Sequence, residues 1–170
     1  TLWVVALLIV NVIWSNVARS EASQQLNDRG FEFQPERSVP IKAVFGSDAE
    51  LPVTMTSEFV HRDDPNRSLN VSWMLIDASN NVVLRWDGLT NQVAVIEADL
   101  PPGQYTLNTT VGENVDAIQK LDIAPFAPIA TIGHVLLSLL LIALAFGESA
   151  VRKFIAKKIE QSEASDDKPK

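Results

Sequence analysis

The segment LPPGQYTLNTT, residues 100–110, carries the clearest structural signal in this 170-residue chain. It opens with two prolines and a glycine, which are typical of a tight turn. From Gln104 onward, apolar and polar side chains alternate, so that Tyr105, Leu107 and Val111 share one face. Because successive side chains of a strand point to opposite faces, the segment predicts a turn followed by a half-buried β-strand.

The same period of two recurs on both sides of this segment. It predicts strands over residues 51–59, 70–77, 104–111 and 115–123, and shorter apolar runs predict strands over 31–34, 40–45, 82–86 and 92–98. Turn residues separate them, as in Ala78-Ser79-Asn80-Asn81, where asparagine tolerates positive φ. About seven or eight short strands predict a mainly β protein, with an antiparallel β-sandwich over residues 31–124.

Residues 100–107 resemble the tyrosine corner of immunoglobulin-like and fibronectin-type-III-like sandwiches, in which the tyrosine hydroxyl bonds to an upstream backbone group. Trp73 resembles the core tryptophan of that fold. Leu107 stands where an antibody domain carries its second cysteine, and this chain has no cysteine. The resemblance implies an Ig-like sandwich whose fold-defining residues are Trp73, Gly103 and Tyr105. It implies no function.

Two uncharged apolar runs flank the β-rich region. The second run, residues 123–147, has 25 residues without Asp, Glu, Lys or Arg. A helix of about 20 residues crosses a hydrocarbon core about 30 Å thick. We therefore expect a transmembrane helix with a cytoplasmic extension over residues 127–160, and a disordered charged tail over 161–170.

The first run, residues 1–18, is just long enough to span a membrane. We expect a retained transmembrane helix, followed by a linker over residues 19–30. The alternative is a secretory signal peptide cleaved near Ser20-Glu21-Ala22, although no basic residues precede the apolar run. The chain is thus expected to have one or two transmembrane helices.

Basic residues next to a span stay in the cytoplasm. The basic cluster after the second run consists of Arg152, Lys153, Lys157 and Lys158, and we expect it to anchor the helix end at anionic headgroups. This orientation predicts a plasma-membrane protein with an extracytoplasmic sandwich and a cytoplasmic C-terminus. Inside the two runs lie Asn11 and His134, which we expect to make intramembrane helix contacts.

The charge and residue content argue against several functions. Residues 19–126 hold sixteen acidic and eight basic residues, and this balance repels nucleic acid. Their single histidine, His61, and the absence of cysteine exclude a cupredoxin copper site and a thiol nucleophile. We therefore expect no enzyme, no metal and no cofactor. The oxygen-rich stretch Asp77, Ser79 and Asn81 would suit a cation, but a hairpin turn explains it better.

Three sequences match the N-glycosylation pattern, at Asn66, Asn70 and Asn108, all between the two apolar runs. Taken together, the features predict a non-enzymatic, membrane-anchored interaction module. We expect an accessory or structural subunit of a membrane protein complex, whose partners are the lipid bilayer and other integral membrane proteins. The alternative is a ligand- or cation-binding cell-surface receptor that uses the loops of the sandwich.

Overall fold

The structure is a computed structural model that describes residues 2–166, with side chains described as far as Lys158. The chain forms two compact units. One is a β-unit, Ala18–Pro128, and the other is a helical unit made from the two flanking segments.

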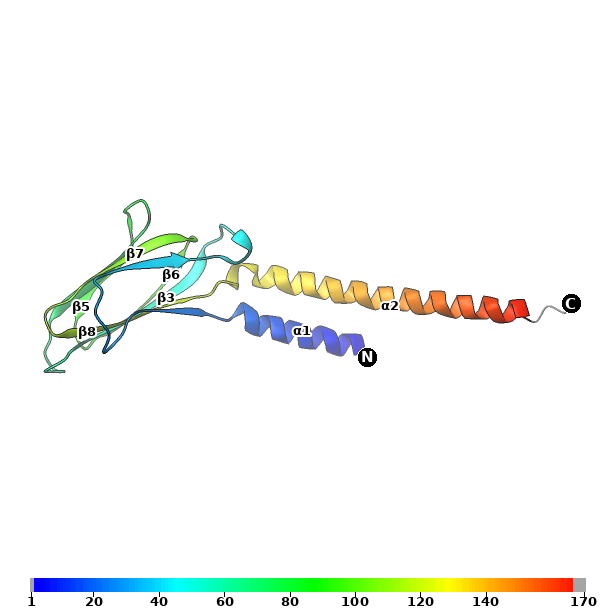
Figure 1. The fold of residues 1–170 in the computed structure, drawn as a ribbon, viewed down its shortest axis with the longest axis horizontal. Helices are drawn as coiled ribbons and strands as arrows, with labels where there is room; N and C mark the ends of the chain where they lie inside the picture. Colours follow the sequence, from blue (N-terminus) through cyan, green and yellow to red (C-terminus); the bar gives the residue numbers. More distant parts are fainter. Residues whose placement is uncertain (1, 167–170) are drawn as a thin grey trace. The chain divides into compact units, whose positions relative to one another are not determined.

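The β-unit is an antiparallel sandwich of two four-stranded sheets (Figure 1). The first sheet has the order β1 (Ala22–Asn27), β8 (Val115–Ile123), β3 (Leu51–His61) and β6 (Val93–Leu100). The second has the order β2 (Glu36–Ile41), β7 (Gly103–Thr110), β4 (Asn70–Ile76) and β5 (Val82–Leu89). Among the described residues these are eight strands, which confirms the predicted mainly β, antiparallel sandwich. The arrangement is compatible with an Ig-like or jelly-roll-like fold.

The core lies between the sheets and consists of the alternating side chains that the sequence placed on one face. Along β3, every second residue from Leu51 to His61 is buried. Trp73 on β4 is 1% exposed, and its indole nitrogen donates to the Ser57 hydroxyl at 2.8 Å. The Phe59 and Trp86 rings stack with their centroids 5.7 Å apart. The core therefore joins both sheets through aromatic side chains.

The turn before β7 has the tie expected from the resemblance. The hydroxyl of buried Tyr105 donates to the carbonyl of Pro101 at 2.7 Å. Gly103 follows this turn, but its φ is not positive, and a Cβ there would make only ordinary contact with the Tyr105 ring at 3.6 Å. The structure thus gives the tyrosine a clear role and does not require glycine at position 103.

The start of the sandwich differs from the sequence-based prediction. Residues 22–27, assigned to a linker, form β1 and pair with β8. Only Leu26 of this strand is a large apolar residue, so alternation gave no signal. The expected strand over residues 31–34 is absent, because Asn27 bonds this segment as a loop: its amide nitrogen donates to the Gln34 carbonyl at 3.2 Å, and its amide oxygen accepts from the Gln34 amide at 3.1 Å.

The next predicted strand, residues 40–45, is displaced. The observed β2 is Glu36–Ile41, and residues Val44–Gly46 form the short 3-10 turn η1. Phe45 and Gly46 in this turn have positive φ, which is incompatible with an extended strand. The apolar pair Val44-Phe45 led to the prediction of a strand, whereas the backbone forms a turn there.

The helical unit contains α1, Leu2–Ala18, and α2, Ala130–Asp166, which follows the 3-10 turn η2, Ala127–Ile129. Residues 161–166 are helical, so the prediction of a disordered tail is wrong for these residues. Extending a formed helix adds one hydrogen bond for each residue ordered, and therefore favours its continuation. Residues 167–170 lie outside the described part.

The chain enters and leaves the sandwich at one end. Ala22, the first residue of β1, pairs with Ile123, the last residue of β8. The connection 42–50 and the turn before β7 lie at the same end, because Ile41 pairs with Gly103 and Leu51 with Leu100. We call this the junction end. The loops 28–35, 62–69, 90–92 and 111–114 form the opposite, distal end.

Candidate functional site

The richest group of polar contacts in the helical unit joins α1 to α2. Its members, here called the polar cluster, are Asn11, Ser15, His134 and Ser138. The Asn11 amide oxygen lies 2.7 Å from His134 Nδ1, and the Asn11 amide nitrogen donates to the Ser138 hydroxyl at 3.2 Å. The Ser15 hydroxyl lies 3.4 Å from His134 Nε2. The structure thus brings together the two residues that the sequence singled out within the apolar runs.

The contacts define which ring nitrogen of His134 carries the proton. The Asn11 amide nitrogen also donates to the Leu7 carbonyl at 2.9 Å, which orients the amide oxygen toward His134. An amide oxygen only accepts hydrogen bonds, so His134 Nδ1 must donate. The Ser15 hydroxyl donates to the Asn11 backbone carbonyl at 2.9 Å, so the cluster also ties Ser15 to the backbone of α1.

Two further contacts set the register of the helices. The Trp14 indole donates to the Ala130 carbonyl at 2.7 Å, and its ring covers Gly133, where an added Cβ would lie 2.1 Å from a ring carbon. Near the other end of α1, the Trp3 indole donates to the Glu148 carboxylate at 2.8 Å. The helices are therefore antiparallel, as their side-by-side course in Figure 1 also shows.

The exterior of the helix pair is apolar. The large exposed side chains on α2 include Ile132, Val135, Leu136, Leu139 and Leu140, each more than half exposed. A shallow apolar groove of about 150 Å³ between the helices is lined by Trp3, Val4, Leu7, Leu141, Ile142 and Ala145. This is the reverse of a soluble helix, which turns its apolar side chains inward.

One described helical segment, Ala127–Lys158, is long and apolar enough to cross a membrane by length and composition. None of its most apolar 18-residue window is buried inside the protein. The other apolar helix, α1, is shorter, at 17 residues. Ala127–Lys158 is therefore a possible span by length, composition and exposure.

The basic cluster lies on the continuation of α2 beyond the polar cluster. Arg152, Lys153, Lys157 and Lys158 are all exposed. The Arg152 guanidinium is 2.5 Å from the Glu148 carboxylate, which also accepts from Trp3. Arg152 of the basic cluster is therefore linked, through Glu148, to the contact between Trp3 on α1 and Glu148 on α2.

The sequon asparagines lie along β4 and β7 or in the loop before β4. Asn66 and Asn70 are exposed. Asn108 is half-buried within β7, where its neighbours across the sheet are Glu36 on β2 and Met74 on β4. All three asparagines belong to the β-unit.

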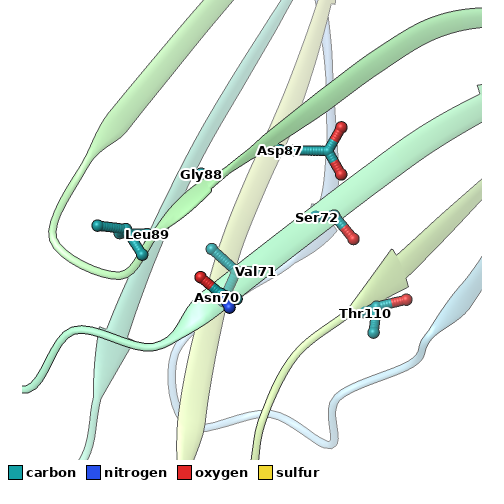
Figure 2. Close-up of a pocket in the computed structure, with 7 residues that line it drawn as sticks. All are labelled: Asn70, Val71, Ser72, Asp87, Gly88, Leu89 and Thr110. Carbon is teal, nitrogen blue, oxygen red and sulfur yellow. The ribbon is translucent and has the colours of Figure 1, made fainter.

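An open hollow of about 540 Å³ lies on the β4–β5 side of the sandwich, and Figure 2 shows the residues that line it. Its lining comprises Asn70, Val71, Ser72, Asp87, Gly88, Leu89 and Thr110. The one carboxylate, Asp87, accepts hydrogen bonds from Arg85 at 2.7 and 3.1 Å, which lower the pKa of Asp87 below its usual range. The hollow thus offers hydroxyl and amide groups and an already paired carboxylate.

The oxygen-rich stretch of the β4–β5 connection is a turn. The Asp77 carboxylate accepts from the backbone amides of Ser79 and Asn81, each at 2.8 Å, and from the Asn81 side chain at 3.0 Å. The Asn81 side-chain and backbone bonds lower the pKa of Asp77. Asn80 has φ 64°, as this turn requires. Within the described residues, no three His, Asp or Glu side chains gather in a group able to hold a metal ion.

His61 ends β3 and is 4% exposed. Its Nδ1 accepts a hydrogen bond from the Asp64 backbone amide at 3.1 Å. The bond holds the 62–69 loop against the distal end of the sandwich, which gives this histidine a structural role.

A charged group near the junction end fastens the edge strand β1. The Asp122 carboxylate on β8 accepts from the Ser23 hydroxyl and lies 2.9 Å from Lys120 Nζ. Partial burial alone would raise the pKa of Asp122, but the bonds from Ser23 and Lys120 bring this pKa below its usual value. The ionised carboxylate is therefore the form that the folded sandwich favours.

Ser15 and Ser138 were not predicted as contact residues from the sequence. Each lies four residues after a polar residue of the same helix, Asn11 and His134 respectively, and residues four apart share a helix face. This spacing was the available signal.

The fold and helix contacts define the class of protein: a β-sandwich whose two ends continue into a pair of apolar helices joined by polar contacts. No protein-family model matches the chain, and no curated protein matches it. A solved structure of the tobacco streak virus coat protein dimer is similar over 61% of this chain and 84% of that chain, with 11% identity and a TM-score of 0.33. A solved structure of infectious bursal virus derived T=1 particles is similar over 64% of this chain and 33% of that chain, with 14% identity and a TM-score of 0.30. At these scores the likeness carries no argument about this chain.

Proposed function

We propose that the chain is a non-enzymatic, membrane-anchored interaction module, an accessory or structural subunit of a membrane protein complex. The observation that carries the proposal is the inverted character of the helix pair. Its polar groups bond to one another between the helices, whereas its exterior consists of exposed leucine, isoleucine and valine side chains.

A lipid bilayer is the environment that suits such a surface. In water, an exposed apolar cylinder would favour association, because large apolar patches are driven to leave water. In hydrocarbon, an unpaired polar side chain would be unfavourable, and the contacts between Asn11, His134 and Ser138 remove that penalty. Both properties support a pair of transmembrane helices.

The basic cluster supports the orientation. Positive residues beyond the end of a span stay on the cytoplasmic side, so Arg152 to Lys158 would be inside and the sandwich outside, in the plasma membrane. The Tyr105–Pro101 bond and the buried Trp73 favour an Ig-like assignment for that outer domain. Such domains are common binding platforms.

The connection at both ends supports an accessory role. A sandwich attached through two spans is restrained near the bilayer, which favours contact with neighbours in the same membrane. The apolar helix exterior offers van der Waals packing to partner helices, as transmembrane association requires. We therefore propose other integral membrane proteins as partners.

Topology can be tested with single cysteines, because the native chain has none. Ser79→Cys lies in an exposed turn of the sandwich, and Ala156→Cys on the exposed end of α2. On intact cells, a membrane-impermeant maleimide should label position 79 at once and position 156 only after permeabilisation. Equal labelling of both positions on intact cells would contradict the proposed orientation.

Partnership is tested by solubilising the tagged chain in a mild detergent at native expression. A partner membrane protein should co-purify in fixed ratio and be identified by mass spectrometry. A chain that resists alkaline extraction from membranes yet purifies as a lone monomer would retain the anchor and refute the accessory role.

A further inference from the structure

Phe45 is the most exposed large apolar side chain among those the structure describes, at 89% exposed. It lies in η1, shown in cyan in Figure 1, with φ 58° and ψ 23°. The left-handed backbone region is uncommon for any residue with a side chain and is a genuine outlier for a bulky one. Gly46 continues the same turn with φ 66°.

The described contacts of the sandwich explain neither the exposure of the Phe45 ring nor its positive φ. A strained backbone persists where the surroundings or a function require it, and an aromatic ring in water forgoes its largest source of stabilisation. Asparagine, which occupies the other positive-φ positions without glycine among the described residues, at 80, 91 and 114, would suit the turn better. A phenylalanine at this position therefore calls for a contact outside the sandwich.

The position of η1 within the sandwich indicates what that contact is. The loop 42–50 belongs to the junction end, where the chain enters β1 and leaves β8. The chain continues from this end into apolar helices, so if those helices span a bilayer, the junction end is the end of the sandwich that is connected directly to the spans.

We propose that Phe45 is an interfacial anchor, whose ring enters the boundary between headgroups and acyl chains of the outer leaflet. The inference rests on the proposed membrane anchoring. Aromatic rings favour this interfacial layer. Exposed Lys42 can extend its ammonium to lipid phosphates, whereas exposed Asp48 and Glu50 keep the rest of the loop in water. The contact would limit tilting of the sandwich on its two connections.

The test uses the cysteine-free full chain, with one cysteine introduced per variant, labelled with a nitroxide and reconstituted in phosphatidylcholine vesicles. Phe45→Cys reports the loop. Phe31→Cys is the matched control, because Phe31 is 70% exposed in the distal 28–35 loop. Ile142→Cys on α2 reports membrane insertion of the helix. Power saturation of the spin signal compares access of oxygen, which enters lipid, with access of a polar nickel chelate, which does not.

We expect the label at position 45 to lie about 5–10 Å into the interface, with nickel access about half or less of that at position 31. The label at 142 should have high oxygen and low nickel access. If 45 matches 31 while 142 shows the hydrocarbon signature, the interfacial anchor is wrong and the membrane anchoring stands. If 142 is as accessible to nickel as 31, both proposals are wrong.

A second series keeps the native phenylalanine. A label at exposed Ala49 in the same loop is measured with Phe45 present and in the variant Phe45→Asn. Asparagine accepts the positive φ, so the turn is preserved while the ring is lost. Nickel access at position 49 should rise in Phe45→Asn, and an unchanged value would overturn the proposal.

Discussion

The hydrogen bond between Asn11 and His134 predicts a measurable coupling between α1 and α2. Each residue is replaced by leucine, singly and together. Loss of Asn11 leaves His134 Nδ1 without its acceptor, and loss of His134 leaves the Asn11 amide oxygen without its donor. Either single change should loosen the pair, and the double change should loosen it by less than the two single effects combined.

The magnitude follows from one interhelical bond of 2.7 Å between neutral groups. Double-mutant cycles of such bonds within membranes average about 0.6 kcal/mol and reach about 1.7 kcal/mol, which correspond to factors of about 3 and about 20 in an equilibrium constant. Asn11 also donates to Ser138, and His134 also lies 3.4 Å from Ser15, so each single replacement removes a second interhelical contact besides the shared bond.

A disulfide equilibrium measures the pairing within the intact chain. Cysteines replace Leu7 and Leu141, which line the same groove between the helices. Equilibration with reduced and oxidised glutathione in detergent gives the effective concentration of one thiol at the other. We expect each single leucine variant to lower this concentration, and the double variant to show a coupling of about 3-fold to about 20-fold.

Asn16→Leu is the matched control on the same helix. The Asn16 amide donates only within α1, to the Val12 carbonyl at 3.0 Å, and the side chain is exposed. This variant should leave the disulfide equilibrium unchanged. Strictly multiplicative effects of the Asn11 and His134 changes would refute the reasoning, because they would show that the 2.7 Å contact contributes nothing to pairing.

Three further predictions concern the sandwich and use denaturant unfolding of the full chain. Tyr105→Phe should lower the free energy of unfolding by about 0.5–1.5 kcal/mol, the net value of one hydrogen bond. An unchanged denaturation midpoint would show that the bond from Tyr105 to Pro101 does not stabilise the sandwich. Gly88→Ala should lower it by about 1–3 kcal/mol through overpacking, since a Cβ there would lie 2.2 Å from the Trp86 ring, whereas Gly103→Ala should have little effect. Because the folded pKa of Asp122 is lowered, its contribution is present above the unfolded pKa and is lost as pH falls through the folded one. Asp122→Asn should therefore flatten the loss of stability on acidification, and an unchanged pH profile would contradict this.

Most strands were predictable because each buries one face against the other sheet. In β8, Val115, Ala117, Leu121 and Ile123 share the buried face, interrupted only by Gln119, and the predicted bounds 115–123 agree with the structure. The strand β1 was not predictable, because it is a polar edge strand held by backbone pairing with β8 and by the Ser23–Asp122 contact. Period-two analysis detects burial, whereas an edge strand of this kind buries little.

The loop errors have a different cause. Residues 28–35 are shaped by the Asn27 side chain, which bonds the Gln34 backbone seven residues away and the Gln119 side chain at 2.8 Å. Such a contact depends on the completed fold, because Gln119 comes from β8. No pattern within residues 28–35 specifies it.

The helix contacts were partly predictable. The sequence singled out Asn11 and His134 as polar residues in apolar runs, and the structure places them in one cluster. Their partners Ser15 and Ser138 were missed, although each lies one turn further on the same face. That Trp14 lies on Gly133 depends on the antiparallel register, which neither helix encodes alone.

The register of the helix pair has a physical source that apolar packing cannot supply. Lipid tails are as apolar as leucine, so rotating either helix in a bilayer changes its apolar contacts little. Rotation would, however, separate Asn11 from His134. It would also move the Trp14 ring away from Gly133 and onto residues whose Cβ atoms leave no room for the ring. The few polar and small residues therefore determine which faces meet, and leave the remaining apolar circumference exposed, where the proposed bilayer and partner helices would pack.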